Sequence, residues 1–320
     1  MSRKLVVMIP DLAEELISRI CSESERQGFQ AIYSGGLQEV LPDLEDAEVI
    51  FAQDSRVCRY APKVRWICTP SAGVDHFLRP GKLDPRTELT NSSGAYGVTI
   101  AEHVIMVTLE MMRRKAEYNE AVRQKHWIRD LHIDSIRGSR IVLLGTGDIG
   151  RECAKRLRAF DPASLTGVNR QGKNPENLFD RVVTADRLEE LLPETDLLIL
   201  SLPATAETRN ILSAERLSLL PETARLVNVG RGSALDQKAL ERMLRDGKLA
   251  SAALDVFEKE PIPAEDSLWE CPRLLITPHI AGNMTLDYTV EKIVDQFLED
   301  LENYAADRPL RYRVDRERAY

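Results

Sequence analysis

The sequence predicts an α/β fold with two doubly wound parallel-sheet domains. Three observations predict it. The chain has 320 residues, which is too long for one comfortable core and suits two. Short apolar runs alternate with helical patterns along most of it, which is typical of βα units and a parallel sheet. The alternation also stops at a polar arm around Trp127 and starts again at Ile141.

The first series of apolar runs predicts four buried strands, at Leu5 to Ile9, Ala31 to Tyr33, Val49 to Ala52 and Trp66 to Thr69. A helical pattern over Asp11 to Cys21 follows the first of them. The stretch Val98 to Lys125 contains neither Gly nor Pro and carries Ile100, Val104 and Met111 at helical spacing. This stretch predicts one long helix that ends the first series.

The second series predicts six further strands, at Ile141 to Leu144, Leu165 to Val168, Leu197 to Ser201, Leu226 to Val229, Ala252 to Val256 and Leu274 to Ile276. Helical segments separate most of them. A long amphipathic helix is expected over Met284 to Ala305, followed by a short charged tail.

Composition and charge exclude several classes of protein. The net charge of -8 argues against general affinity for nucleic acid or anionic lipid, because that affinity comes from Lys and Arg. The longest apolar runs are far shorter than the roughly 20 residues that cross a membrane, and the N-terminus lacks a signal-peptide pattern. We therefore expect a cytoplasmic protein. The five cysteines include no C-x-x-C pair, so neither a disulfide framework nor a metal site is expected.

A glycine-rich turn opens the second series. A G-x-G-x-x-G sequence follows the apolar run Ile141 to Leu144 and precedes a helical pattern over Arg151 to Phe160. The glycines permit a tight turn, close approach of backbone to a pyrophosphate, and packing of helix on strand. This context predicts a dinucleotide site at the start of the helix. Its residues are Gly145, Thr146, Gly147, Asp148, Ile149 and Gly150.

The residue expected to meet the adenosine ribose lies about 20 residues further on, after the second strand of this series. An acidic residue there would bind the ribose 2′-hydroxyl and repel a 2′-phosphate. This chain has Asn169, followed by the cations Arg170 and Lys173. The pattern favours NADP(H), and NAD(H) stays open as a second cofactor.

Three later blocks resemble the signatures of the D-isomer-specific 2-hydroxyacid dehydrogenases. They are Leu226-Val-Asn-Val-Gly-Arg231-Gly-Ser, Ala253-Leu-Asp255-Val-Phe-Glu-Lys-Glu260-Pro and Thr277-Pro-His279-Ile-Ala-Gly. The resemblance covers nearly the whole chain and includes Ser71-Ala-Gly-Val, Ala101-Glu-His103 and Leu202-Pro203-Ala-Thr205. It implies hydride transfer between a nicotinamide cofactor and a small 2-hydroxy or 2-keto acid.

The resemblance implies that Arg231, Glu260 and His279 are the catalytic residues, and their chemistry agrees. Reduction of a 2-keto acid needs a cation that binds the carboxylate and polarises the ketone, which suits a guanidinium. It also needs a proton donor at the ketone oxygen, which suits His279. A carboxylate from Glu260 beside the imidazole would favour its charged form and fix its orientation.

Further roles come only from the resemblance. The Ala72 and Gly73 backbone N–H groups, together with Arg231 and His279, would bind the substrate carboxylate and ketone. The remaining cofactor-binding residues would be Pro203, Thr208, Val229, Asp255 and His279. His103 is expected to be a packed helix residue rather than a catalytic one.

The resemblance also implies the domain plan and the assembly. A Rossmann cofactor domain, residues 98–287, would be inserted into a flavodoxin-like substrate domain formed by residues 1–97 and 288–320. The helix from Val98 and the Trp127 arm would form a homodimer. The substrate stays open among glyoxylate, hydroxypyruvate, bulkier 2-keto acids and 3-phosphoglycerate. A dehydrogenase-like redox-sensing or corepressor-type binding module is the alternative from another functional class.

Overall fold

The computed structural model describes residues 3–316, so residues 1–2 and 317–320, the ends of the predicted substrate domain, lie outside it. The chain divides into two compact units. The interrupted unit contains the chain up to Tyr96 and again from Met284, and the inserted unit is Gly97–Asn283. Among the described residues, no helix has the length and apolar character needed to cross a membrane.

The interrupted unit is built on a five-stranded parallel sheet with strand order β2-β1-β3-β4-β5. Its strands are β1 (Arg3–Met8), β2 (Phe29–Ser34), β3 (Ala47–Ala52), β4 (Trp66–Cys68) and β5 (Glu88–Thr90). Its α-helices are α1 (Glu14–Arg26), α2 (Leu37–Leu44) and α9 (Asp287–Ala305). This order is that of flavodoxin-like folds.

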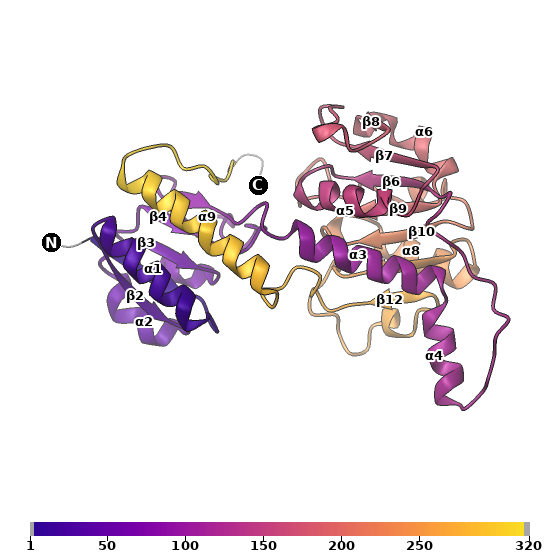
Figure 1. The fold of residues 1–320 in the computed structure, drawn as a ribbon, viewed down its shortest axis with the longest axis horizontal. Coiled ribbons are helices and arrows are strands. Elements are labelled where there is room, and N and C mark those ends of the chain that lie inside the picture. Colours follow the sequence, from indigo (N-terminus) through magenta and orange to yellow (C-terminus); the bar gives the residue numbers. More distant parts are fainter. Residues whose placement is uncertain (1–2, 317–320) are drawn as a thin grey trace. The chain divides into compact units, whose positions relative to one another are not determined.

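Helix α9 returns the end of the chain to the interrupted unit. It lies beside α1 (Figure 1), where Arg19 pairs with Asp295 at 2.6 Å. Its fully buried Phe297 stacks on Phe51 of β3, with ring centroids 4.2 Å apart, and also on Trp66 of β4. Aromatic stacking therefore anchors a segment more than 200 residues away in sequence to the sheet.

The inserted unit is built on a seven-stranded parallel sheet with strand order β12-β11-β10-β9-β6-β7-β8. The strands are β6 (Arg140–Leu144), β7 (Ser164–Val168), β8 (Arg181–Val183), β9 (Leu197–Leu200), β10 (Arg225–Asn228), β11 (Ser251–Leu254) and β12 (Leu274–Ile276). The α-helices are α3 (Gly97–Met112), α4 (Lys115–Arg123), α5 (Asp148–Arg158), α6 (Leu188–Leu191), α7 (Ala214–Leu217) and α8 (Gln237–Asp246).

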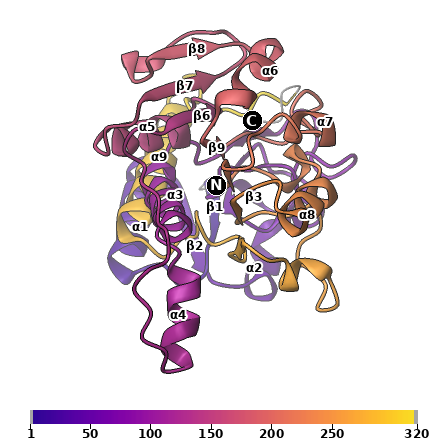
Figure 2. The ribbon, with the colours of Figure 1, turned by 90° about the vertical axis from the view of Figure 1, so that its right-hand side faces the viewer.

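Helices cover both faces of this sheet: Figure 2 shows α3 and α5 on one side and α7 and α8 on the other. The four residues of β9 are all fully buried, which explains its uninterrupted apolar sequence. The strand order is that of a Rossmann fold extended by one strand. The predicted fold class, a Rossmann unit inserted into a flavodoxin-like one, is confirmed.

The prediction of one long helix over Val98 to Lys125 is wrong. Two helices, α3 and α4, share this stretch, and Arg114 between them adopts a left-handed backbone with φ +52°. A left-handed residue ends a helix, because the next N–H no longer points along the helix axis. The side chain of Arg114 pairs with Glu117 at 2.8 Å in the first turn of α4.

Candidate active site

The glycine-rich turn has the geometry of a dinucleotide loop. Gly145 has φ +102°, and a Cβ there would lie 2.8 Å from the Ser201 carbonyl oxygen. A Cβ on Gly150 would lie 2.1 Å from the Gly145 carbonyl oxygen, so α5 packs tightly on β6. A Cβ on Gly147 would meet no atom within 4 Å, so a ligand has room to approach the backbone here. These features fit a pyrophosphate at the N-terminus of α5.

Asn169 organises the loop that follows β7. Its Nδ2 donates to the Thr146 Oγ1 at 2.7 Å and to the Lys173 carbonyl at 2.8 Å, and its Oδ1 accepts from the Gln171 N–H at 3.0 Å. The exposed cations Arg170 and Lys173 therefore stand on a loop with a fixed backbone, next to the dinucleotide turn. A loop held in this way loses little entropy when it binds an anion.

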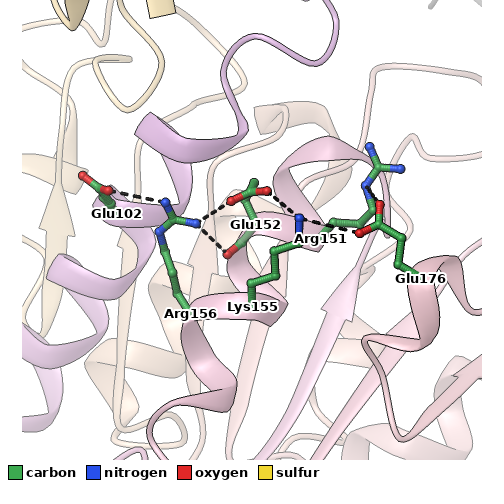
Figure 3. Close-up of polar contacts among 6 residues, drawn as sticks. All are labelled: Glu102, Arg151, Glu152, Lys155, Arg156 and Glu176. Carbon is green, nitrogen blue, oxygen red and sulfur yellow. Dashed lines mark hydrogen bonds and ion pairs between the residues drawn. The ribbon is translucent and has the colours of Figure 1, made fainter. Parts of the chain in front are cut away.

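Ion pairs tie the same loop to α5 (Figure 3). Glu176 lies 3.7 Å from Arg151 and 3.6 Å from Lys155, both on α5. Further along α5, Arg156 reaches Glu102 of α3 at 3.4 Å. Exposed pairs of this kind contribute little to stability, because water and salt screen them. Together they connect α3, α5 and the loop after β7 across the outer surface of the helices.

Asn228 shapes the turn that carries Arg231. It is fully buried at the end of β10, donates to the Arg231 carbonyl at 3.0 Å and accepts from the Gly230 N–H at 3.1 Å. The next residue, Gly232, lies against the backbone of Phe257: a Cβ on it would be 1.9 Å from that carbonyl carbon. The Arg231 turn is thereby fixed against the segment that leads to Glu260.

Glu260 and His279 form a hydrogen-bonded pair. The His279 Nδ1 lies 2.7 Å from the Glu260 Oε2, and the other carboxylate oxygen accepts from the Phe257 N–H at 2.8 Å. The His279 side chain is 51% exposed and the Glu260 side chain 36%. Because Nδ1 is engaged by the carboxylate, Nε2 is the ring nitrogen that can exchange a proton with a ligand.

Asp255 binds the loop that carries His279. Its carboxylate, only 3% exposed, accepts from the Thr277 hydroxyl at 2.6 Å and from the Ile280 and Ala281 N–H groups at 2.9 and 3.0 Å. The backbone of His279 lies between these bonds and has φ +54°. A non-glycine residue in this region costs about 1–3 kcal/mol, so surrounding contacts must hold it there.

The structure brings Arg231, Glu260 and His279 to one edge of the seven-stranded sheet. β10, β11 and β12 are parallel neighbours, and the three residues follow the carboxyl ends of these strands in turn. In open α/β sheets, ligands bind outside the carboxyl ends of the strands. At this edge, the Arg231 guanidinium can bind an anion. The His279 ring, paired with the Glu260 carboxylate, can donate or accept a proton.

The other predicted residues fall into two groups. Pro203 and Thr208 occupy the turn after β9, where the Thr208 hydroxyl donates to the Pro203 carbonyl at 2.6 Å, and Val229 is buried with its N–H bonded to the Leu200 carbonyl. Ala72 and Gly73 belong to the interrupted unit, after β4, where Asn91 donates to the Ala72 carbonyl at 2.7 Å. Within residues 3–316, no cluster of His, Cys, Asp or Glu could hold a metal ion.

Two polar residues were missed by sequence reasoning, one fully buried and one half-buried. Asn228 and Thr277 lie inside the blocks quoted for Arg231 and His279, yet no role was assigned to either. The sequence signal for both is a polar residue that ends or directly follows an apolar run. A polar side chain at the end of a buried strand needs hydrogen-bond partners.

Similar proteins exist at the levels of sequence and structure. The sequence model described as "D-isomer specific 2-hydroxyacid dehydrogenase, NAD binding domain" matches residues 105–281. Glyoxylate/hydroxypyruvate reductase B of Pectobacterium atrosepticum is 32% identical over 289 residues, which cover 87% of this chain and 88% of the relative. Glyoxylate reductase of Thermofilum pendens is 31% identical over 255 residues, which cover 77% and 75%.

Solved structures resemble the whole chain. A D-isomer specific 2-hydroxyacid dehydrogenase family protein from Aeromonas salmonicida has a TM-score of 0.89 at 29% identity, covering 99% of this chain and 100% of its own. One from Xanthobacter autotrophicus, in complex with NADPH and MES, has a TM-score of 0.82 at 26% identity and covers 100% of both chains.

Proposed function

Since the chain belongs to the D-isomer-specific 2-hydroxyacid dehydrogenases, which are NAD(P)-dependent enzymes, we propose that it reduces a small 2-keto acid to the D-2-hydroxy acid with NADPH. The observation that carries the proposal is the placement of Arg231 and the Glu260–His279 pair at one sheet edge. Relatives at 31–32% identity are glyoxylate and hydroxypyruvate reductases, which supports a substrate of that size.

Each residue of the trio has a distinct task in this reaction. The nicotinamide cofactor supplies the hydride that reduces the 2-carbon. The Arg231 guanidinium binds the substrate carboxylate and polarises the ketone, which stabilises negative charge developing on the oxygen. His279 gives its Nε2 proton to that oxygen. The Glu260 carboxylate, 2.7 Å from Nδ1, stabilises the imidazolium before transfer and keeps the ring in place.

The loop after β7 supports NADPH over NADH. Asn169 leaves no negative charge that would repel a 2′-phosphate, while Arg170 and Lys173 supply two cations on a backbone fixed by the Asn169 bonds. The Xanthobacter relative was solved with NADPH, in agreement with this assignment. NADH is expected to serve as the weaker donor.

The deciding experiment measures NADPH and NADH oxidation by the full-length protein with a panel of 2-keto acids, including glyoxylate and hydroxypyruvate. We expect turnover, with kcat/KM higher for NADPH. Oxidation of 3-phosphoglycerate in preference to keto-acid reduction would identify a different substrate. Tight NADPH binding without turnover on any substrate would contradict the enzyme assignment and favour a redox-sensing binding module.

We also propose that the enzyme is a homodimer formed through α3, α4 and the following arm. Large apolar side chains gather on these elements: Trp127 is 91% exposed, and Val122 and Met106 are also exposed. Exposed apolar side chains concentrated on neighbouring segments are typical of protein interfaces. Light scattering after size exclusion should give twice the 36.1 kDa chain mass, and Trp127→Glu should shift the protein towards the monomer.

A further inference from the structure

A chain of hydrogen bonds connects α3 to the loop that carries His279. The Nε2 of His103, on α3, lies 3.3 Å from the Thr277 Oγ1. The Thr277 hydroxyl lies 2.6 Å from the Asp255 Oδ1. The Asp255 carboxylate in turn accepts from the Ile280 and Ala281 N–H groups. All these residues belong to the inserted unit.

Proton accounting fixes the direction of each bond. A threonine hydroxyl has one proton, and the carboxylate of Asp255 can only accept. Thr277 therefore donates to Asp255 and must accept from His103, so the His103 Nε2 carries a proton. The ring is a donor to this chain in either protonation state, because the neutral form with Nε2–H suffices.

The end of the chain is the backbone on either side of His279. Thr277 precedes it by two residues, and the two N–H groups bound by Asp255 follow it directly. His279 itself has the left-handed φ of +54°. A residue in this region stays there only when its surroundings hold it. The orientation of the Thr277 hydroxyl and of the Asp255 carboxylate therefore affects where the His279 ring lies.

We propose that His103 is a positioning residue for the reaction: it orients the Thr277 hydroxyl, which orients Asp255, which holds the His279 backbone so that the ring meets both Glu260 and the substrate. The inference rests on the proposed function, since it assigns an indirect part in that reaction to a residue of α3.

Electrostatics suit a neutral donor at this position. Burial lowers the pKa of His103 below the value of free imidazole, although the negative charge of Asp255 acts in the opposite direction. The lowered pKa favours the neutral ring, which still donates through its Nε2–H. A strongly charged partner at this position would compete with the Ile280 and Ala281 N–H groups for the carboxylate.

Matched variants of the full-length enzyme test the chain at two points. His103→Leu removes the donor, whereas His103→Gln keeps an N–H group at a similar reach. Thr277→Val removes the hydroxyl at constant shape, whereas Thr277→Ser keeps it. We expect His103→Leu and Thr277→Val each to lower kcat at least about tenfold, because small displacements of reacting groups have large effects. The Gln and Ser variants should recover most of the loss.

A second readout follows His279 directly and does not need turnover. The chain has five histidines, so NMR spectra of protein with labelled histidine are simple, and the signal absent from His279→Asn is that of His279. We expect this signal to shift in His103→Leu and Thr277→Val but not in the conservative variants. Glu102→Gln is the control, since it changes the adjacent residue of α3, which pairs with Arg156 (Figure 3), and should leave both readouts unchanged.

The outcomes separate this inference from the proposed function. A loss in the double variant His103→Leu/Thr277→Val no larger than in Thr277→Val supports one connected chain. Additive losses, or a His103→Leu enzyme with full kcat and an unmoved His279 signal, overturn the inference. If the unaltered protein reduces no 2-keto acid, the proposed function fails, and the His279 signal still decides the inference. Should His103→Leu not fold, Thr277→Val tests the same bond from its other side.

Discussion

Gly232→Ala should disable the enzyme through a single methyl group. The added Cβ would lie 1.9 Å from the Phe257 carbonyl carbon, 2.1 Å from its oxygen and 2.5 Å from the Glu258 nitrogen. Backbone atoms on both sides must separate by more than about 1 Å, and a misplacement of that size can lower the rate about a hundredfold. Because Arg231 precedes Gly232 and Glu260 follows Phe257, the separation moves the two groups apart. We expect kcat/KM to fall about a hundredfold.

The same substitution should lower the free energy of unfolding by about 1–3 kcal/mol, as overpacking does. Steady-state kinetics and urea unfolding measure the two effects. Gly36→Ala is the matched control for stability: its φ is -137° and its Cβ would meet only the Glu39 Oε1, at 3.9 Å. Gly36 is the N-cap of α2, where alanine is less favourable than glycine, and the loss of glycine flexibility in the unfolded chain acts in the opposite direction. We therefore expect this variant to be about as stable as the parent. A Gly232→Ala enzyme with the parent kcat/KM would refute the proposed contact.

Four further predictions follow. His279→Ala and Arg231→Ala should each lower kcat/KM about a hundredfold or more, with circular dichroism spectra unchanged. Asn169→Asp should reduce the NADPH:NADH ratio of kcat/KM at least about tenfold, because a carboxylate replaces a donor near the 2′-phosphate; an unchanged ratio would contradict the loop assignment. Asp255→Asn should destabilise the protein by about 2–4 kcal/mol in urea unfolding, since an NH₂ group would face a buried N–H donor. Burial lowers the pKa of His103 in the folded protein, so the unfolded chain binds a proton at this residue more readily. The neutral ring therefore makes its full contribution to stability above the unfolded pKa of about 6.5. That contribution decreases as the pH falls towards the folded pKa. Between about pH 7 and pH 5, the free energy of unfolding should consequently fall less in His103→Gln than in the parent protein. An equal fall in both proteins would argue against a lowered pKa of His103.

Most of the sheet framework could be predicted because buried parallel strands are continuous apolar runs. Residues 141–144 of β6 and all four residues of β9 are such runs, and they are buried, whereas Arg140 at the start of β6 is exposed. The three-residue strands β5 (Glu88–Thr90) and β8 (Arg181–Val183) were missed, because each begins with a charged residue and has no continuous apolar run. The equally short β4 and β12 are apolar throughout and were predicted. The end of α3 was missed because the break depends on the left-handed backbone of Arg114, and no glycine or proline marks this position in the sequence.

The site shows the same division between local pattern and distant contact. The turn at Gly145–Gly150 could be predicted, since its strand, glycines and helix are contiguous in sequence. Arg231, Glu260 and His279 could be proposed as catalytic residues because they belong to recognisable blocks, and the structure joins Glu260 to His279 by a hydrogen bond. The contact between Thr277 and His103 joins residues 174 positions apart, and no pattern in a single sequence encodes it. His103 was expected to be a packed helix residue, and its hydrogen bond to Thr277 became visible only in the folded chain.

The left-handed backbone of His279 also predicts a trade-off between activity and stability. Glycine adopts φ +54° without steric cost, so His279→Gly would relieve backbone strain while removing the proposed proton donor. The most stable residue at this position and the most active one are thus expected to differ, as is common where function requires a strained site. Redesign of this enzyme for stability alone would therefore favour inactive sequences at residue 279. A screen for thermal resistance should keep that position fixed.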